Sequence, residues 1–108
     1  MNYRGRPKKY RLVSVIPKIS QFSPRGKPGR PDKIELTMDE FEAIRLADFM
    51  KLSQKEASEA MRVSQQTFSR ILKKARRVIA DGIVNGKIIR IRGGTYVSTN
   101  SETNQETT

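Results

Sequence analysis

The feature that most constrains the fold is the apolar periodicity of residues 65–81, QQTFSRILKKARRVIAD. The apolar residues recur at i, i+3, i+4, i+7, i+10 and i+11, the repeat of an amphipathic helix: Phe68, Ile71, Leu72, Ala75, Val78 and Ile79. Ser64 directly precedes the repeat and is a favoured N-cap residue. The pattern predicts a helix over about 65–81 with one buried face and one basic, exposed face.

A repeated capping signal predicts two helices before this one. A Ser or Thr followed three residues later by Glu allows each side chain to satisfy a backbone amide of the other residue. The chain contains this spacing twice, at Thr37/Glu40 and at Ser53/Glu56. We therefore expect helices over about 38–50 and 54–61.

The break at 62–64 separates a short helix from a longer amphipathic one, which is the pattern of a helix-turn-helix. Ser58 is small enough for the two helices to approach, and Met61 and Val63 are expected to pack beneath the turn. Arg62 stands where the turn favours a left-handed backbone, a conformation that costs a residue other than glycine about 1–2 kcal/mol. The predicted fold is mainly α, a three-helix helix-turn-helix domain with short flanking β-strands.

The rest of the chain divides by composition. We expect a basic N-terminal arm at 1–11, then a short strand and a Pro/Gly loop at 12–36. The helix-turn-helix domain with its C-terminal strand follows at 37–94, and a disordered tail at 95–108. Gly82 is expected to weaken the last helix, and Asn85–Gly86 to form a turn. The predicted strand at 87–92 would pair with residues 11–16, in the same chain or in a partner's.

The charge distribution favours a polyanion binder. The net charge is +11, of which residues 1–36 carry +8, residues 37–94 carry +5 and residues 95–108 carry −2. A basic arm joined to a basic domain is typical of proteins that bind nucleic acids. Solubility alone is the alternative explanation for such a charge.

Composition argues against an enzyme, a cofactor and a metal site. The chain has no Cys and no His, so thiol nucleophiles, disulfides and the common transition-metal ligands are absent. Capping and the helix dipole explain the acids at the start of the first helix, Asp39, Glu40 and Glu42. No apolar run has the length of a signal-peptide core or a membrane span, so we expect a cytoplasmic protein and no membrane partner.

Rotation by 100° per residue locates the exposed face of the third helix. At its N-terminal end this face carries five residues expected to read bases: Gln65, Gln66, Thr67, Ser69 and Arg70. Gln can form two hydrogen bonds with adenine, and Arg two with guanine. Residues expected to contact phosphates are Ser64, Lys73, Lys74 and Arg77, with Arg4, Arg6, Lys8 and Lys9 of the arm. Because no acid lies between Gln65 and Ala80, we expect no anion-repelling charge on this surface.

Two Gly-Arg-Pro tripeptides stand among basic residues, at 5–7 and at 29–31. Such segments can lie in the narrow minor groove of A·T-rich DNA, where an arginine meets enhanced negative potential. Simple attraction of the arm to phosphates is the alternative.

At this level of detail the chain resembles a known family. The stretches RPKKYRLV, LTMDEFEAIRLAD, LSQKEAS, VSQQTFSRIL and VNGKIIRIRGG are similar to uncharacterised protein family 0251 of predicted DNA-binding proteins. Residues 37–77 also resemble the helix-turn-helix of region four in sigma-70-type factors. The resemblance implies a sigma-region-four-like fold and DNA binding through Gln65, Gln66, Ser69 and Arg70. Arg62 departs from the family's usual turn glycine, and the cysteine-rich extension of some relatives is missing.

These observations predict sequence-specific binding of double-stranded DNA and a role in transcriptional regulation. Because one small unit reads few bases, a homodimer is a hypothesis, formed through the strand at 87–92 or the exposed part of the first helix. Alternatives are an RNA- or ribosome-associated basic protein and a sigma-like adaptor that binds RNA polymerase. Few aromatic residues are left to stack on single-stranded RNA, which argues against the first. The target sequence, the sign of regulation and any effector do not follow from the sequence.

Overall fold

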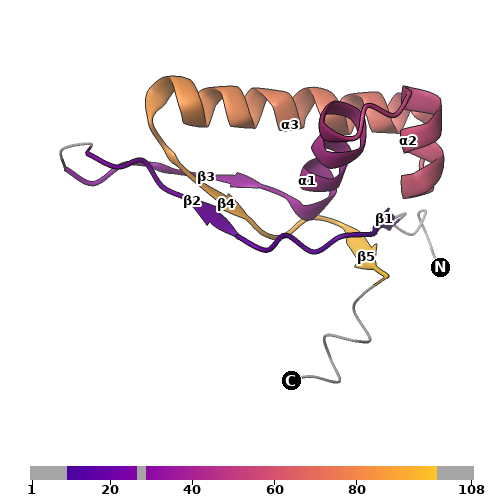
Figure 1. The fold of residues 1–108 in the computed structure, drawn as a ribbon, viewed down its shortest axis with the longest axis horizontal. Helices are drawn as coiled ribbons and strands as arrows, with labels where there is room; N and C mark the ends of the chain where they lie inside the picture. Colours follow the sequence, from indigo (N-terminus) through magenta and orange to yellow (C-terminus); the bar gives the residue numbers. More distant parts are fainter. Residues whose placement is uncertain (1–9, 27–28, 100–108) are drawn as a thin grey trace, which may run out of the picture.

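The computed structural model describes residues 10–26 and 29–99, in which three α-helices pack beside five short strands (Figure 1). The helices are α1 (Met38–Ile44), α2 (Gln54–Met61) and α3 (Gln65–Asn85), and α1 continues as a π-helical segment, η1 (Arg45–Phe49). The strands are β1 (Arg11–Val13), β2 (Gln21–Phe22), β3 (Lys33–Leu36), β4 (Ile88–Ile91) and β5 (Tyr96–Ser98). None of the described helices is sufficiently long and apolar to cross a membrane.

The predicted helix starts are confirmed, because the capping side chains act as expected. Ser53 Oγ accepts from the Glu56 amide, and Glu56 Oε1 accepts from the Ser53 amide, both at 3.0 Å. Glu40 Oε1 accepts from the Thr37 amide at 2.9 Å in front of α1. Ser64 Oγ accepts from a backbone amide in the first turn of α3. These bonds satisfy donors that a helix N-terminus would otherwise expose.

The turn between α2 and α3 has the predicted left-handed residue. Arg62 adopts φ 59° and ψ 45°, and its amide donates to the Glu59 carbonyl at 3.1 Å. The Val63 amide donates to the Ser58 carbonyl at 3.0 Å, which closes the end of α2. Ser58 is 2% exposed, in agreement with the need for a small residue where the helices meet.

The third helix is longer than predicted, and the interpretation of Gly82 is wrong. α3 runs through Gly82 to Asn85 and ends at Gly86, which caps it with φ 64°. A Cβ on Gly82 would lie 2.6 Å from Cδ1 of Ile89 in β4. Glycine is therefore needed for the close approach of helix and strand, and the helical bonds tolerate it.

The predicted pairing of residues 87–92 with residues 11–16 is also wrong. β4 is the central strand of a three-stranded sheet, antiparallel to β2 and parallel to β3. β1 instead pairs in parallel with β5, so the start of the predicted tail is a strand. The predicted loop likewise contains two strands, β2 and β3. A parallel neighbour requires a long crossover, which α1, α2 and α3 supply between β3 and β4. Residues 100–108 of the predicted tail lie outside the described residues.

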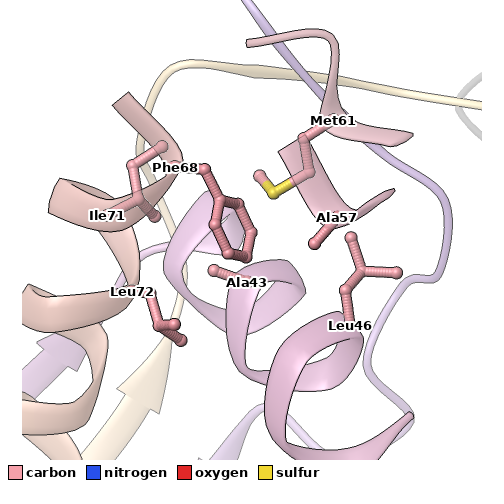
Figure 2. Close-up of a cluster of buried hydrophobic side chains, with 7 residues drawn as sticks. All are labelled: Ala43, Leu46, Ala57, Met61, Phe68, Ile71 and Leu72. Atoms are coloured by element: carbon pink, nitrogen blue, oxygen red, sulfur yellow. The ribbon is translucent and has the colours of Figure 1, made fainter. Parts of the chain in front are cut away.

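Two groups of buried side chains hold these elements together. The first joins α1, η1, α2 and α3 around the fully buried Phe68 ring (Figure 2): Ala43, Leu46, Ala57, Met61, Phe68, Ile71 and Leu72. The second joins α1 and α3 to the strands: Val13, Leu36, Met38, Ala75, Val78 and Ile91. The opposite face of α3 is consequently turned to solvent.

Candidate nucleic-acid interface

The outward face of α3 carries most of the residues predicted to contact DNA. Figure 2 shows Phe68, Ile71 and Leu72 on the side of α3 that meets α1 and α2. Thr67 is half-buried at the edge of the outward face. The other predicted residues of α3 are exposed: Gln65, Gln66, Ser69, Arg70, Lys73, Lys74 and Arg77. The fold therefore brings these predicted residues together on one rigid helix.

The hydroxyl groups of Ser64 and Thr67 are linked to each other at the start of α3. Ser64 Oγ accepts from the Thr67 amide at 3.0 Å and donates to Thr67 Oγ1 at 2.9 Å. Thr67 retains its own hydroxyl proton as a donor for a base or a phosphate. Ser64 is thus first of all the N-cap of α3, a role in addition to the phosphate contact predicted for it.

Acids from α1 and η1 neutralise two of the five cations of α3. Lys74 Nζ lies 3.9 Å from Glu40 Oε2, and Arg76 donates to both oxygens of Asp48, at 2.6 and 3.1 Å. The hydrogen bonds from Arg76 lower the pKa of the Asp48 carboxyl, and the same bonds raise the pKa of Arg76. Within the described part of the chain, three cations of α3 form no ion pair within 4.0 Å: Arg70, Lys73 and Arg77, of which Arg77 still interacts electrostatically with Asp81.

The expectation of a surface without anion-repelling charge is wrong. A hollow of about 280 Å³ lies beside the first turns of α3, and Arg70 and Lys74 line it together with Asp39 and Glu40 of α1. The two carboxylates are buried, at 8% and 4% exposure of their residues. They come from a helix about thirty residues earlier in the chain, so a scan of α3 alone could not reveal them.

The explanation of Glu42 by the helix dipole is likewise wrong. Its residue is 1% exposed, and Arg45 donates Nε and Nη2 to its two oxygens, both at 2.9 Å. The Ser14 amide adds a third bond at 3.0 Å. Glu42 thus ties the segment after β1 to α1, and its hydrogen bonds raise the pKa of Arg45. Capping does account for Glu40, and Asp39 accepts from the Thr37 hydroxyl at 2.6 Å.

Arg11 and the loop after β4 also line the hollow, and the sequence did not single them out. Arg11 Nε lies 3.7 Å from Asp39 Oδ2. Gly94 in that loop has φ 95°, and a Cβ there would lie 2.7 Å from Asp39 Oδ1. The basic residues around Arg11 could have indicated that Arg11 belongs to the site. The position of the loop beside the hollow, in contrast, depends on the pairing of β1 with β5.

The arm and loop predictions have different outcomes. Four predicted phosphate contacts lie outside the described residues: Arg4, Arg6, Lys8 and Lys9. The second Gly-Arg-Pro tripeptide, at 29–31, lies in the connection between β2 and β3. Figure 1 places that connection at the end of the molecule opposite α2 and the first turn of α3. Among the described residues, no group of three or more potential ligands could hold a metal ion.

Comparisons with known proteins give a family and no activity. The family described as "Protein of unknown function DUF134" matches residues 1–99. A UPF0251 protein of Caldicellulosiruptor bescii is 49% identical over 92 residues, which cover 85% of this chain and 64% of that protein. The UPF0251 protein Teth39_0655 of Thermoanaerobacter pseudethanolicus is 48% identical over 92 residues, 84% of this chain and 78% of that protein.

A third relative, a UPF0251 protein of Prosthecochloris aestuarii, is 48% identical over 94 residues, which cover 86% of this chain. The aligned region spans less than two thirds of the Caldicellulosiruptor and Prosthecochloris proteins, 64% and 61% of their lengths. No solved structure matches the chain.

Proposed function

The chain belongs to the DUF134 family, whose relatives are named UPF0251 proteins, and we propose that it binds double-stranded DNA in a sequence-specific manner as a transcriptional regulator. In this proposal α2, the turn at Arg62 and α3 act as a helix-turn-helix of the sigma-70 region-four type. The activity is binding and not catalysis.

The observation that carries the proposal is the outward face of α3. From Gln65 to Arg77 this face exposes amides, hydroxyls and cations, and no acid interrupts it along the helix. The fully buried Phe68 fixes the helix from behind, so the polar face is presented on a rigid support. An exposed basic helix by itself would often be only a solvated surface, and the short α2 and its tight turn distinguish this one.

The geometry suggests that the first turns of α3 contact bases and that its later turns contact phosphates. The N-terminal turns would enter the major groove, where Gln66 can pair with adenine and Arg70 with guanine. Lys73 and Arg77 lie one and two turns further along the same face, where phosphate contacts would set the register. Lys74 should contribute less than predicted from the sequence, because Glu40 lies 3.9 Å from its ammonium group.

Selection from a random duplex library at about 150 mM salt would test this proposal. We expect an enriched motif. Arg70→Ala should cost about 1–3 kcal/mol on the preferred duplex and relax one base position. Arg25→Ala removes the same charge from an exposed site before β3 and should leave the motif unchanged.

Retention of duplexes without any enrichment would contradict sequence-specific binding and leave only attraction to phosphates. Equal losses from Arg70→Ala on all duplexes would show that this arginine contacts the backbone and not a base. A failure to retain duplex DNA, combined with retention of RNA or of RNA polymerase, would replace the proposal by one of those partners.

A further inference from the structure

We propose that a second copy of the chain docks on an apolar flank of the molecule when two copies occupy neighbouring half-sites on DNA. The apolar flank consists of Val15, Ile19, Phe22 and Ile83. The inference that DNA promotes this contact rests on the proposed function, whereas the contact surface itself does not.

The four side chains form a continuous surface and not scattered exposed residues. Val15, Ile19 and Phe22 line one hollow, and Phe22 and Ile83 line the next, so the Phe22 ring joins the two. Exposed fractions are 38% for Val15, 57% for Ile19, 55% for Phe22 and 73% for Ile83. Contiguous exposed apolar surface of this kind usually marks an interaction site.

Charge argues against nucleic acid as the partner on this flank and permits an identical chain. Two copies that each carry +11 repel each other overall, so a contact between them is least costly where the surface is locally uncharged. All four residues of the flank are apolar. Lys87, which lines the hollow at Ile83, is paired with Asp81 at 2.9 Å, and Lys18 lines the hollow at Val15 and Ile19.

The direction of the flank is compatible with two copies on one duplex. Ile83 follows Gln66 by seventeen residues on the same helix, which places it about 100° around α3 from Gln66. A two-fold axis parallel to the outward direction of Gln66 would therefore bring the two flanks together. It would also turn both α3 reading faces to the same side.

The length of α3 allows a suitable half-site spacing. Ser69 precedes Ile83 by fourteen residues, or about 21 Å along the helix, so two antiparallel copies can hold their reading turns up to about 42 Å apart. Half-sites one turn of DNA apart are separated by about 34–36 Å, within this reach. The strand expected earlier to form the dimer cannot do so by its edges, because β4 already has β2 and β3 as neighbours.

The size of the flank indicates a weak contact that DNA reinforces. Taking about 200 Å² for a fully exposed large side chain, the four residues present roughly 400 Å². A standard stable interface buries about 800 Å² per partner. The contact should therefore be sparse in dilute protein and become populated when adjacent half-sites raise the local concentration.

Cross-linking through single cysteines tests the flank directly, because the natural chain has none. Ile83→Cys is treated with a short bismaleimide, alone and on a duplex of about 40 bp retained in the library selection, which is long enough for two half-sites. Val97→Cys is the matched control, since Val97 is 48% exposed on β5. We expect roughly tenfold more covalent dimer from Ile83→Cys on the duplex.

A second variant separates docking from DNA binding. Phe22→Asp in the Ile83→Cys background should abolish the cross-link and leave affinity for a short duplex with one site unchanged. Equal dimer yields from the two cysteine variants on a duplex that both bind would overturn the inference. If neither variant binds duplex, the proposed function fails, and the cross-link in concentrated protein without DNA decides the flank. Preferential dimer from Ile83→Cys there supports it, and equal yields refute it.

Discussion

Replacing Glu42 with alanine tests how the molecule is held together, because the sequence and the structure assign that residue different roles. The structure shows a carboxylate at 1% exposure that accepts both bonds from Arg45 at 2.9 Å and one from the Ser14 amide at 3.0 Å. Its removal takes three bonds away at once and leaves the Arg45 side chain, which is 20% exposed, beside an empty space.

Breaking one partner of a buried ion pair costs about 3–5 kcal/mol, and we expect Glu42→Ala to lower the free energy of unfolding by that amount. A favourable interaction with the dipole of α1, which is what the sequence suggested, would account for only about 0.3–1 kcal/mol. Since a small domain is stable by about 5–15 kcal/mol, the larger loss would be a substantial part of the total.

Urea denaturation of the wild type and the variant measures this loss, and Glu35→Ala is the matched control. Glu35 pairs with Arg92 at 3.1 Å, but the two side chains are 54% and 64% exposed, so the control should cost between about 0 and 1 kcal/mol. If Glu42→Ala costs no more than Glu35→Ala, the buried-anchor reasoning is refuted.

Three further predictions follow from the same geometry. Phe68→Ala should destabilise the protein by about 3–5 kcal/mol because the ring is fully buried, and thermal denaturation with no loss would contradict the packing in Figure 2. Lys73→Ala should reduce the slope of log DNA affinity against log salt concentration by about one unit, and Lys74→Ala should reduce it by less, because Glu40 already faces Lys74. Equal reductions in the two variants would show that the ion pair between Lys74 and Glu40 is unimportant. Finally, the hydrogen bonds from Arg76 lower the folded-state pKa of Asp48, so the ion pair stabilises the protein at pH values above the unfolded-state pKa of 3.8. This stability is lost as the pH falls through the folded-state pKa of Asp48. Because the pair is exposed, Asp48→Asn should remove less than about 1 kcal/mol of this acid dependence in urea titrations at decreasing pH, and an unchanged pH profile would contradict the linkage.

The helices were predictable because their signals are local. Ser53, Glu56 and Ser64 satisfy amides within three residues of themselves, and such bonds can be read from spacing alone. Arg62 was placed in the left-handed region for the same reason, since a tight link between two helices requires that conformation in one residue.

The strands β1 and β4 were predicted, whereas β2, β3, β5 and the pairing of the strands were missed because the partners are distant in sequence. β2 has two residues and lies in a Pro- and Gly-rich segment, so no alternation of apolar residues marks it. The alternation of Lys33, Ile34, Glu35 and Leu36 was a usable signal for β3, but it does not reveal that β4 is its parallel neighbour. The end of α3 was missed because the reason for Gly82 is a side chain of β4.

The candidate site shows the same division between local and distant information. Rotation along α3 found its exposed face correctly, because the periodicity of one helix determines which residues face away from the core. The acids that alter this face come from α1 and η1, at Glu40 and Asp48, and only the packing of these elements against α3 places them there. Sequence alone therefore overestimates how many of the cations are available to a polyanion.

The acids that stabilise the fold also select which cations of α3 remain for a partner. Glu40 uses one oxygen to cap α1 and turns the other toward Lys74, while Asp48 fixes Arg76 to the end of the same helix. The three remaining cations, Arg70, Lys73 and Arg77, fall within an arc of about 60° at 100° per residue, centred near Gln66. Unpaired charge is thus confined to the stripe that continues from the base-reading turns, whereas the two cations outside that arc are neutralised. A duplex would therefore meet a single line of charge along α3, which constrains its orientation as well as its affinity.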